Sequence, residues 1–315
     1  LPKPKLMEES GWFYSDFTVH LDEMKDGVTV RYTLNGSEPT SDSEAMQDSM
    51  TLSCSSVLRL RAFSNGCIPS ETSTYSFLFP EREVTLPLFS ITSNQDALYG
   101  ENFGIFSDKL QADSLRNYEH DWHRCAYVEF FMEDGTKILD QPCELRVMGG
   151  TSRNHPQKSL SLYSRKRLSG GDFLCSLWNE KAHIGKVHSF VLRNAGNDFL
   201  FAHLRDAAAQ SVAGKYLQDI DYQAYQPAVV FINGEYYGLM NIRERTNEDF
   251  ASSNYGYTDV DVIENWFQVN NGSFDEAEEL YDMLSSNTLS YADLIRKVDV
   301  TELIKIGRAS CRERV

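Results

Sequence analysis

Residues 228–240 (AVVFINGEYYGLM) decide the fold of the second half of the chain. Two apolar runs flank Asn233-Gly234, and this dipeptide readily supplies the two positive φ angles that a type I′ turn needs. The stretch therefore predicts a β-hairpin.

Segments that precede the hairpin extend the strand pattern. The sequence predicts further strands at residues 88–92, 127–131, 143–148, 159–163 and 189–193. Short apolar or alternating runs bounded by turn residues, such as Asp134-Gly135, are typical of strands.

Helices are expected around and after the hairpin. Residues 201–216 predict a helix near a candidate cap, Asp198, and the residues on its apolar face would be Leu204, Ala208, Val212 and Tyr216. Residues 273–276 (SFDE) have the spacing of a capping box and open a second helix, and residues 290–298 predict a third. We thus expect an α+β domain in which mostly antiparallel sheet precedes the helices.

The first part of the chain reads as short, evenly spaced strands. Residues 28–34, 57–63 and 72–79 alternate between apolar and polar positions, which predicts a β-sandwich of roughly 70 residues. Residues 32–40 (YTLNGSEPT) and 58–62 (LRLRA) resemble the Ig-like C-terminal module of chitobiase and β-hexosaminidase. Such modules usually act as spacers in extracellular bacterial proteins.

Within that module, Asn35, Glu38 and Thr40 are interpreted as turn residues rather than as a sugar site. We expect residues 1–79 to form the module and residues 80–87, which begin and end with Pro, to form a linker.

The second domain is expected to occupy residues 88–305 and to be truncated at its C-terminus. Residues 306–315 (IGRASCRERV) lack periodicity and resemble the translation of a sequencing-adapter oligonucleotide. We interpret them as foreign, and the alternative is a natural basic tail.

Charge excludes some classes of partner. The 315 residues carry a formal net charge of −16, and such a surface repels nucleic acid and anionic membranes. No apolar run is long enough to span a membrane, and no signal peptide is visible. Because the chain starts at Leu1 rather than Met, we expect an N-terminal piece to have been lost, so the missing signal does not argue against export.

The six cysteines show neither a CxxC pair nor metal-ligand spacing. A Cys54–Cys67 bridge is one alternative, and free, buried thiols are the other. His120 and His123 flank Trp122 without a third ligand at zinc spacing. The motifs of serine hydrolases, zinc proteases and P-loop proteins are missing.

Three clusters of Gly, Asn and charged residues follow one another in the second domain. The first spans residues 149–153 (GGTSR) and 156–160 (PQKSL). The second spans residues 192–198 (LRNAGND), followed by Leu204-Arg205-Asp206. The third begins at the hairpin, residues 231–238, and ends with residues 241–244 (NIRE). In this order and spacing, over about residues 86–305, they resemble the CotH kinase family, named for spore coat protein kinases.

The first cluster suggests a phosphate contact. Gly149 and Gly150 let backbone N–H groups approach an anion closely, while Arg153 and Lys158 add positive charge in an acidic protein. Lys158 is our candidate for binding a nucleotide's phosphates.

The other clusters allow two interpretations. Asn197 and Asp198 line the nucleotide pocket or hold Mg²⁺, or else they cap a helix while Arg193 pairs with a buried carboxylate. Arg205 and Asp206 are expected to form interior salt bridges. Glu244 pairs with Lys158, as in protein kinases, or faces the adenine side of the nucleotide pocket, or else belongs to a solvated charge cluster.

The resemblance implies an atypical extracellular or cell-surface Ser/Thr kinase that uses ATP and Mg²⁺ on an exported or surface protein. The family's catalytic aspartates lie downstream of the matched region, so we expect this chain to transfer no phosphate. The alternatives are a non-catalytic adhesion protein, with glycan contact through the sandwich, and a coat-assembly protein.

Overall fold

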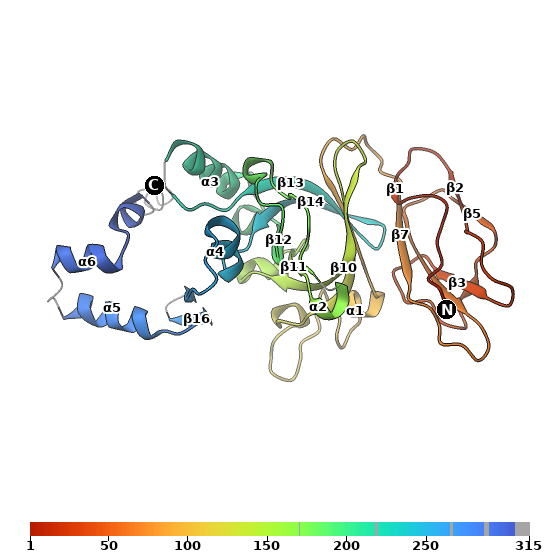
Figure 1. Ribbon diagram of the computed structural model, residues 1–315, viewed down its shortest axis with the longest axis horizontal. Helices are drawn as coiled ribbons and strands as arrows, with labels where there is room; N and C mark the ends of the chain where they lie inside the picture. Colours follow the sequence, from red (N-terminus) through yellow and green to blue (C-terminus); the bar gives the residue numbers. More distant parts are fainter. Residues whose placement is uncertain (170, 218–219, 265–266, 287–289, 306–315) are drawn as a thin grey trace.

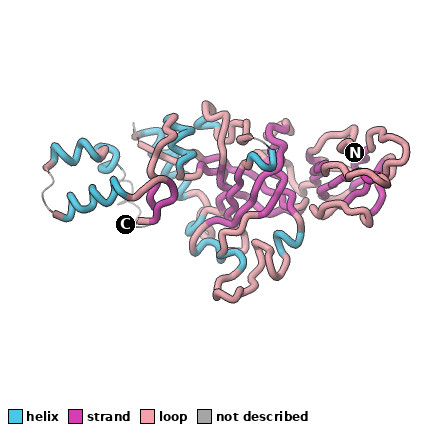
Figure 2. Tube along the Cα trace, turned by 60° about the horizontal axis from the view of Figure 1, so that its bottom comes forward, coloured by secondary structure: helices cyan, strands magenta, loops and turns pink. Residues whose placement is uncertain are grey.

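The computed structural model describes residues 1–169, 171–217, 220–264, 267–286 and 290–305. Within these residues the strands form a small N-terminal unit and a closed barrel, and most helices lie beyond the barrel, away from the N-terminus (Figures 1 and 2). The predicted α+β class is confirmed. The adapter-like residues 306–315, including Cys311, lie outside the described residues.

The N-terminal unit consists of a sheet in the order β1-β7-β6-β3-β4 and a separate pair, β2 and β5. Its strands are β1 (Gly11–Trp12), β2 (Phe17–His20), β3 (Thr29–Thr33), β4 (Glu44–Ala45), β5 (Ser49–Leu52), β6 (Ser56–Phe63) and β7 (Ser73–Leu78). The three strands that the sequence predicted here correspond to β3, β6 and β7. Their apolar side chains, among them Val30, Leu58, Leu60 and Phe77, bury a core of their own.

Strands β8 to β14 close into a barrel in the order β10-β11-β12-β14-β13-β8-β9. They are β8 (Leu88–Ser93), β9 (Arg124–Phe131), β10 (Lys137–Met148), β11 (Ser159–Tyr163), β12 (Ser189–Arg193), β13 (Tyr225–Ile232) and β14 (Glu235–Glu244). Every neighbouring pair is antiparallel except β8 and β13, which run parallel. Closure removes the unpaired edges that an open sheet would expose.

The predicted hairpin joins β13 to β14. Asn233 has φ 51° and Gly234 has φ 85°, the two positive angles that the sequence led us to expect. Gly238, further along β14, has φ 133°, and a Cβ there would lie 2.3 Å from Nε2 of Gln157. A glycine is therefore required where the first cluster approaches the hairpin.

Side chains alternate between the inside and the outside of the barrel along each strand, which gives an apolar interior and two different outer faces. Phe89, Phe130, Leu162, Phe190 and Ile242 are fully or almost fully buried in its core. The outward side of β8, β9 and β13 packs on the N-terminal unit. Their residues Leu88, Phe131 and Phe231 form a shared apolar cluster with Leu78 of β7.

The two units also touch through small groups. A Cβ on Gly36 would lie 2.4 Å from Oδ1 of Asn233, so only glycine fits at this contact. The hydroxyls of Ser76 and Ser90 are 2.7 Å apart, and a hydrogen bond joins them across the interface. The N-terminal unit is thus fixed to the barrel by close contacts in addition to the linker.

The helices are α1 (Gln95–Tyr99), α2 (Lys166–Ser169), α3 (Arg205–Tyr216), α4 (Glu248–Tyr255), α5 (Asp275–Ser285) and α6 (Tyr291–Lys297). Short 3-10 turns lie at η1 (Asn117–Glu119), η2 (Thr151–Asn154), η3 (Asn179–Lys181) and η4 (Gly196–Asp198), and a small ribbon is formed by β15 (Val262–Glu264) and β16 (Gln268–Asn271). Among the described residues, none of the helices combines the length and the apolar character that crossing a bilayer requires.

The predicted apolar face of α3 is wrong. Leu204, Val212 and Tyr216 are more than half exposed. The helix instead contacts its neighbours along Ala207, Gln210 and Gly214, and a Cβ on Gly214 would lie 2.5 Å from the Tyr222 ring.

Two predicted helix starts are also corrected. The helix expected from residue 201 begins at Arg205, because His203, with φ 61°, interrupts the chain before it. The expected capping box of α5 does not form, since the N-cap is Phe274 and its side chain makes no capping hydrogen bond.

The cysteines of the described residues are all free. Cys54 and Cys67 are exposed and unbridged, so the disulfide alternative is wrong, and Cys125 is exposed as well. The other interpretation, free and buried thiols, is confirmed for Cys143 and Cys175 and is wrong about the burial of Cys54, Cys67 and Cys125.

One carboxyl is buried where the barrel meets the N-terminal unit. Glu129 of β9 is fully buried, and Lys137 Nζ lies 3.5 Å from its Oε1. Burial raises the pKa of Glu129 to about 7, although the hydroxyls of Ser10 and Ser76 and the charge of Lys137 act in the opposite direction.

This pKa makes the fold pH-dependent. Between pH 4.5 and 7 the folded protein holds a proton that the unfolded chain has lost, so the free energy of unfolding falls as pH rises. The variant Glu129→Gln lacks this pH dependence, because a glutamine side chain does not bind a proton in this range. We expect its stability relative to the parent to increase by about 3 kcal/mol from pH 4 to pH 8. Urea unfolding at several pH values measures this, and parallel pH profiles would contradict it.

Candidate functional site

The three sequence clusters meet at one end of the barrel. Register places Met148 at the end of β10 opposite Ser159 at the start of β11, and Arg193 at the end of β12 opposite Asn241 within β14. Asn194 of the second cluster donates its Nδ2–H to the carbonyl of Gln157 at 2.6 Å.

Tyr237 of the third cluster completes this junction. The backbone N–H of Lys158 donates to the Tyr237 hydroxyl at 2.7 Å. Residues that are 79 positions apart in the sequence are therefore hydrogen-bonded neighbours.

Lys158 is buried in this junction, with a relative exposure of 6%. Its ammonium donates to the carbonyls of Arg153 at 2.8 Å and His155 at 3.3 Å, and it lies 3.8 Å from the centroid of the Tyr118 ring. Two carbonyls and a ring face thus satisfy this cation, and no carboxylate of the described residues forms an ion pair with it. Burial lowers the pKa of Lys158, and the charge of Asp108 partly opposes that effect.

The alternative in which Lys158 pairs with Glu244 is wrong, and barrel register gives the reason. Glu244 lies opposite Phe190, which lies opposite Leu162 on β11. Lys158 precedes Leu162 by four residues, or about 13 Å along a strand. Lys158 and Glu244 therefore belong to opposite ends of the barrel.

The glycines of the turn before Lys158 are explained by the conformation of the turn itself. Gly149 has φ 119°, and a Cβ there would lie 2.4 Å from the Ser152 hydroxyl. Gly150 precedes the 3-10 turn η2 and has open space beside its Cα. Arg153, in η2, donates to the carbonyl of Glu119 at 2.6 Å and forms an ion pair with Asp121 at 2.9 Å. Its guanidinium therefore fastens the segment before β9.

Asp198 in the second cluster caps the start of α3. Its carboxylate accepts the backbone N–H groups of Ala202 at 3.2 Å and Arg205 at 3.1 Å. Burial alone would raise the pKa of Asp198, but these N–H groups and the Arg205 charge lower it. The helix-capping interpretation fits this carboxylate, while its neighbour Asn197 is exposed.

Arg205 and Asp206 form ion pairs, but not in the interior as expected. Arg205 reaches Asp198 at 3.4 Å with a mostly exposed side chain. Asp206 lies 3.4 Å from Arg193 and 3.7 Å from Arg243, and its side chain is about one-third exposed.

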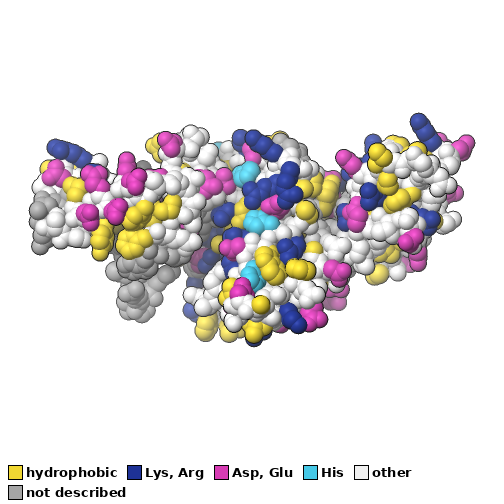
Figure 3. Space-filling model, turned by 90° about the horizontal axis from the view of Figure 1, so that it is seen from below, with side chains coloured by type: hydrophobic (Ala, Val, Ile, Leu, Met, Phe, Trp, Pro, Cys, Tyr) yellow, Lys and Arg dark blue, Asp and Glu magenta, His cyan; other side chains and the backbone are white. Residues whose placement is uncertain are grey.

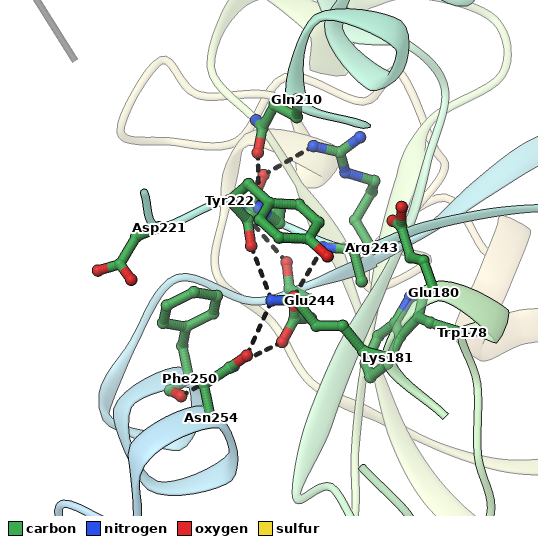
Figure 4. A network of polar contacts seen from close by, with 12 residues as sticks. Trp178, Glu180, Lys181, Gln210, Asp221, Tyr222, Arg243, Glu244, Phe250 and Asn254 are labelled. Carbon is green, nitrogen blue, oxygen red and sulfur yellow. Dashed lines mark hydrogen bonds and ion pairs between the residues drawn. The ribbon is translucent and has the colours of Figure 1, made fainter. Parts of the chain in front are cut away.

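Glu244 has a lysine partner that the sequence did not indicate. Lys181 of η3 donates to Glu244 Oε2 at 2.6 Å, to the carbonyl of Tyr222 at 2.8 Å and to Asn254 Oδ1 at 2.8 Å (Figure 4). Both charged groups are buried. No motif signalled Lys181, because it lies in an irregular segment between β11 and β12.

The second half of this network satisfies Glu244. The backbone N–H of Ala224 donates to its Oε2 at 2.7 Å, and Asn254 donates to its Oε1 at 2.7 Å. Since Lys181 has no N–H left for a ligand, the pair joins η3, β14 and α4 as a structural contact. The interpretation of Glu244 as a solvated charge is wrong as well.

Arginines gather on the outward side of the barrel, on the wall that does not contact the N-terminal unit. We call this surface, formed by Arg146, Arg193, Arg243 and Arg245, the arginine face. Register places Arg146 opposite Ser161, Ser161 opposite Val191, and Val191 opposite Arg243, in one row across the strands.

On one face of the molecule (Figure 3), the charged side chains over the barrel differ from those over the C-terminal helices. Lys, Arg and His side chains gather over the barrel, and Asp and Glu side chains over the helices at the far end (Figure 3).

Carboxylates compensate the arginine face only in part. Asp206 is shared between Arg193 and Arg243, and Asp121 pairs with Arg146 at 3.4 Å. Arg245 lies 4.9 Å from the Tyr163 ring and forms no ion pair with any described residue. The face therefore keeps a positive excess in a protein with a net charge of −16.

Several polar atoms of this face lack a partner. Arg243 is 1% exposed, and its Nε and Nη1 find no hydrogen-bond acceptor in the described part of the chain. The hydroxyl of Ser161 is likewise buried and unpaired. Unsatisfied guanidinium N–H groups are suited to an anion, because arginine binds phosphate in a bidentate manner.

The described residues do not suit a magnesium ion. Within those ranges no group of three or more His, Cys, Asp and Glu side chains could hold a metal. The carboxylate of Asp198 is already occupied by backbone N–H groups and by Arg205.

Comparison with known families confirms both resemblances. Residues 145–302, half of the chain, match the model of a family described as CotH kinase protein. Residues 8–74 match the model described as Chitobiase/beta-hexosaminidase C-terminal domain. No curated protein matches the chain.

Because the Lys181–Glu244 pair is buried, removing one partner should lower the free energy of unfolding more than replacing both. Lys181→Met leaves Glu244 charged and buried, so we expect a loss of about 3–5 kcal/mol in the free energy of unfolding. Adding Glu244→Leu should recover part of that loss. Urea unfolding measures both variants.

Lys186→Met is the matched control, because it removes an exposed lysine that pairs with Asp172 at 3.2 Å. It should cost less than about 1 kcal/mol. A loss for Lys181→Met no larger than this control would contradict the structural role of the pair.

Proposed function

Because the chain belongs to the family of CotH kinase proteins, we propose that it binds the phosphates of ATP on the arginine face. We further propose that the parent protein transfers a phosphoryl group to Ser or Thr of an exported or surface protein. The observation that carries the binding proposal is Arg243, a buried guanidinium with two unpaired nitrogens in an acidic protein.

Phosphoryl transfer suits such a surface physically. Catalysis in this chemistry rests on positioning and on neutralising the charge of the phosphate oxygens. Arg193, Arg243 and Arg245 would hold those oxygens, and Tyr163 keeps the Arg245 guanidinium in place through its ring. Bound ATP would supply the group to be transferred.

Lys158 has a different part in this proposal. Its ammonium is satisfied by two carbonyls and the Tyr118 ring, so contact with a phosphate would require it to release one of them. Together with Gly149, Gly150 and Arg153 it would support the junction of the three clusters. Asn197 is exposed and would be free to contact nucleotide.

The described residues offer neither a site for magnesium nor a candidate for the catalytic acids. We propose that both depend on aspartates that the family carries downstream of the matched region. Residues 1–315 would then bind nucleotide without transferring phosphate. We also propose an extracellular or cell-surface location, as the N-terminal module suggests.

A non-catalytic surface or coat-assembly role is the second candidate. The satisfied states of Lys158 and of the Lys181–Glu244 pair favour it, since neither lysine needs a ligand to complete its contacts. Under this alternative, nucleotide would bind at no site of the protein.

Calorimetric titration with ATP, with and without Mg²⁺, distinguishes the two functions. We expect the parent to bind and Arg245→Met to bind about 10- to 150-fold more weakly, since one charge-assisted hydrogen bond is worth about 1.5–3 kcal/mol. Its thermal stability should change little, because Arg245 is only partly buried.

Arg296→Met, an exposed arginine of α6, is the control and should bind ATP like the parent. If the parent, Arg245→Met and Arg296→Met bind ATP with equal affinity, the arginine face is not the ATP site. If the parent does not bind ATP, the non-catalytic alternative stands. Transfer of labelled phosphate by residues 1–315 would contradict the expected inactivity.

A further inference from the structure

A cleft of about 750 Å³ lies between the N-terminal unit and the barrel. One wall comes from β6 and the chain before and within β7, the other from β8, β9 and β10. This volume is in the range of ligand pockets, and such pockets occur preferentially where two domains meet.

The cleft is preformed, because close contacts fix its two walls. The apolar cluster of Leu78, Leu88, Phe131 and Phe231 joins the units, and Ser76 and Ser90 are hydrogen-bonded beside it. Gly36 leaves no room for a side chain against Asn233. A ligand therefore meets walls that are already held in position, which lowers the cost of binding.

Hydroxyl, amide and paired charged groups line the cleft. Thr72 and Thr74 face it from the N-terminal unit, and Thr92, Asn94 and Tyr127 face it from the barrel. Lys3 and Arg59 carry positive charge, and Glu38, Glu71 and Asp140 carry negative charge, so the excess is a single negative charge. Glu38 is paired with Arg59 at 2.6 Å. Such a lining offers both hydrogen-bond donors and acceptors, as a ligand rich in hydroxyl groups requires.

Two buried polar atoms in this lining, one on Arg59 and one on Thr92, have no partner among the described residues. Thr92 is 2% exposed, and its Oγ1 makes no hydrogen bond to any described residue. Alternation along β8 directs Thr92 out of the barrel, because Phe89 and Ile91 occupy the core. The hydroxyl therefore points toward the N-terminal unit. A buried hydroxyl without a partner is costly, which indicates a contact that is completed by something else.

We propose that this cleft binds a neutral, polyhydroxylated ligand of the carbohydrate class, with hydroxyl groups that contact both walls. The N-terminal unit then acts as half of a binding site instead of only a spacer. This site lies on the barrel wall opposite the arginine face and does not depend on the nucleotide proposal.

The test starts with an array of neutral and acidic oligosaccharides, probed with the intact chain. The soluble form of the strongest neutral ligand is then titrated calorimetrically. We expect Thr92→Val to weaken binding about 10-fold, while its thermal stability stays the same or rises because the unpaired hydroxyl is gone. Thr74→Val on the facing wall should also weaken binding.

Thr51→Val is the matched control, since Thr51 pairs with Thr18 on the exposed surface of the N-terminal unit. It should bind the ligand like the parent. Lack of any neutral glycan on the array, preference for acidic glycans, or unchanged affinity of both cleft variants would each overturn the proposal. Because ATP titration uses the opposite face, failure here leaves the proposed nucleotide site untouched.

Discussion

Closure of the barrel is the constraint on which the other features depend. Once β8 pairs with both β9 and β13, every strand has two neighbours and the register of each strand is fixed. That register places Lys158 and Glu244 at opposite ends of the barrel. Each charge then finds its own compensation, carbonyls and a ring for Lys158 and the ammonium of Lys181 for Glu244.

The same closure divides the outside of the barrel into walls with different chemistry. The wall of β8, β9 and β13 is apolar and hydroxyl-rich, and it packs against the N-terminal unit. The opposite wall carries arginines between serines and a tyrosine, and part of its hydrogen-bonding capacity is unused. On this wall Arg146, Ser161, Arg193 and Arg243 each bury a polar atom without a partner among the described residues. Such atoms are costly for folding, and the proposed ligand rests on that cost.

Local sequence signals predicted the helices and strands, but they did not predict the contacts between distant residues. Asn233-Gly234 identified the hairpin because a type I′ turn is encoded by two adjacent residues. Closure could not be predicted, since the pairing of β8 with β13 joins residues about 140 positions apart and leaves no periodic trace. The spacing of Leu204, Val212 and Tyr216 misidentified the packing side of α3, because tertiary contacts chose Ala207 and Gly214 instead. Lys181 was missed for a similar reason: only the folded chain brings it to Glu244.

A crystal structure of the chain with a non-hydrolysable ATP analogue would locate the phosphates directly. We expect phosphate oxygens within hydrogen-bonding distance of Arg193, Arg243 or Arg245, with Lys158 still bound to the carbonyls of Arg153 and His155. Phosphates bound at the Lys158 end of the barrel, or a Lys158 ammonium paired with Glu244, would contradict this expectation.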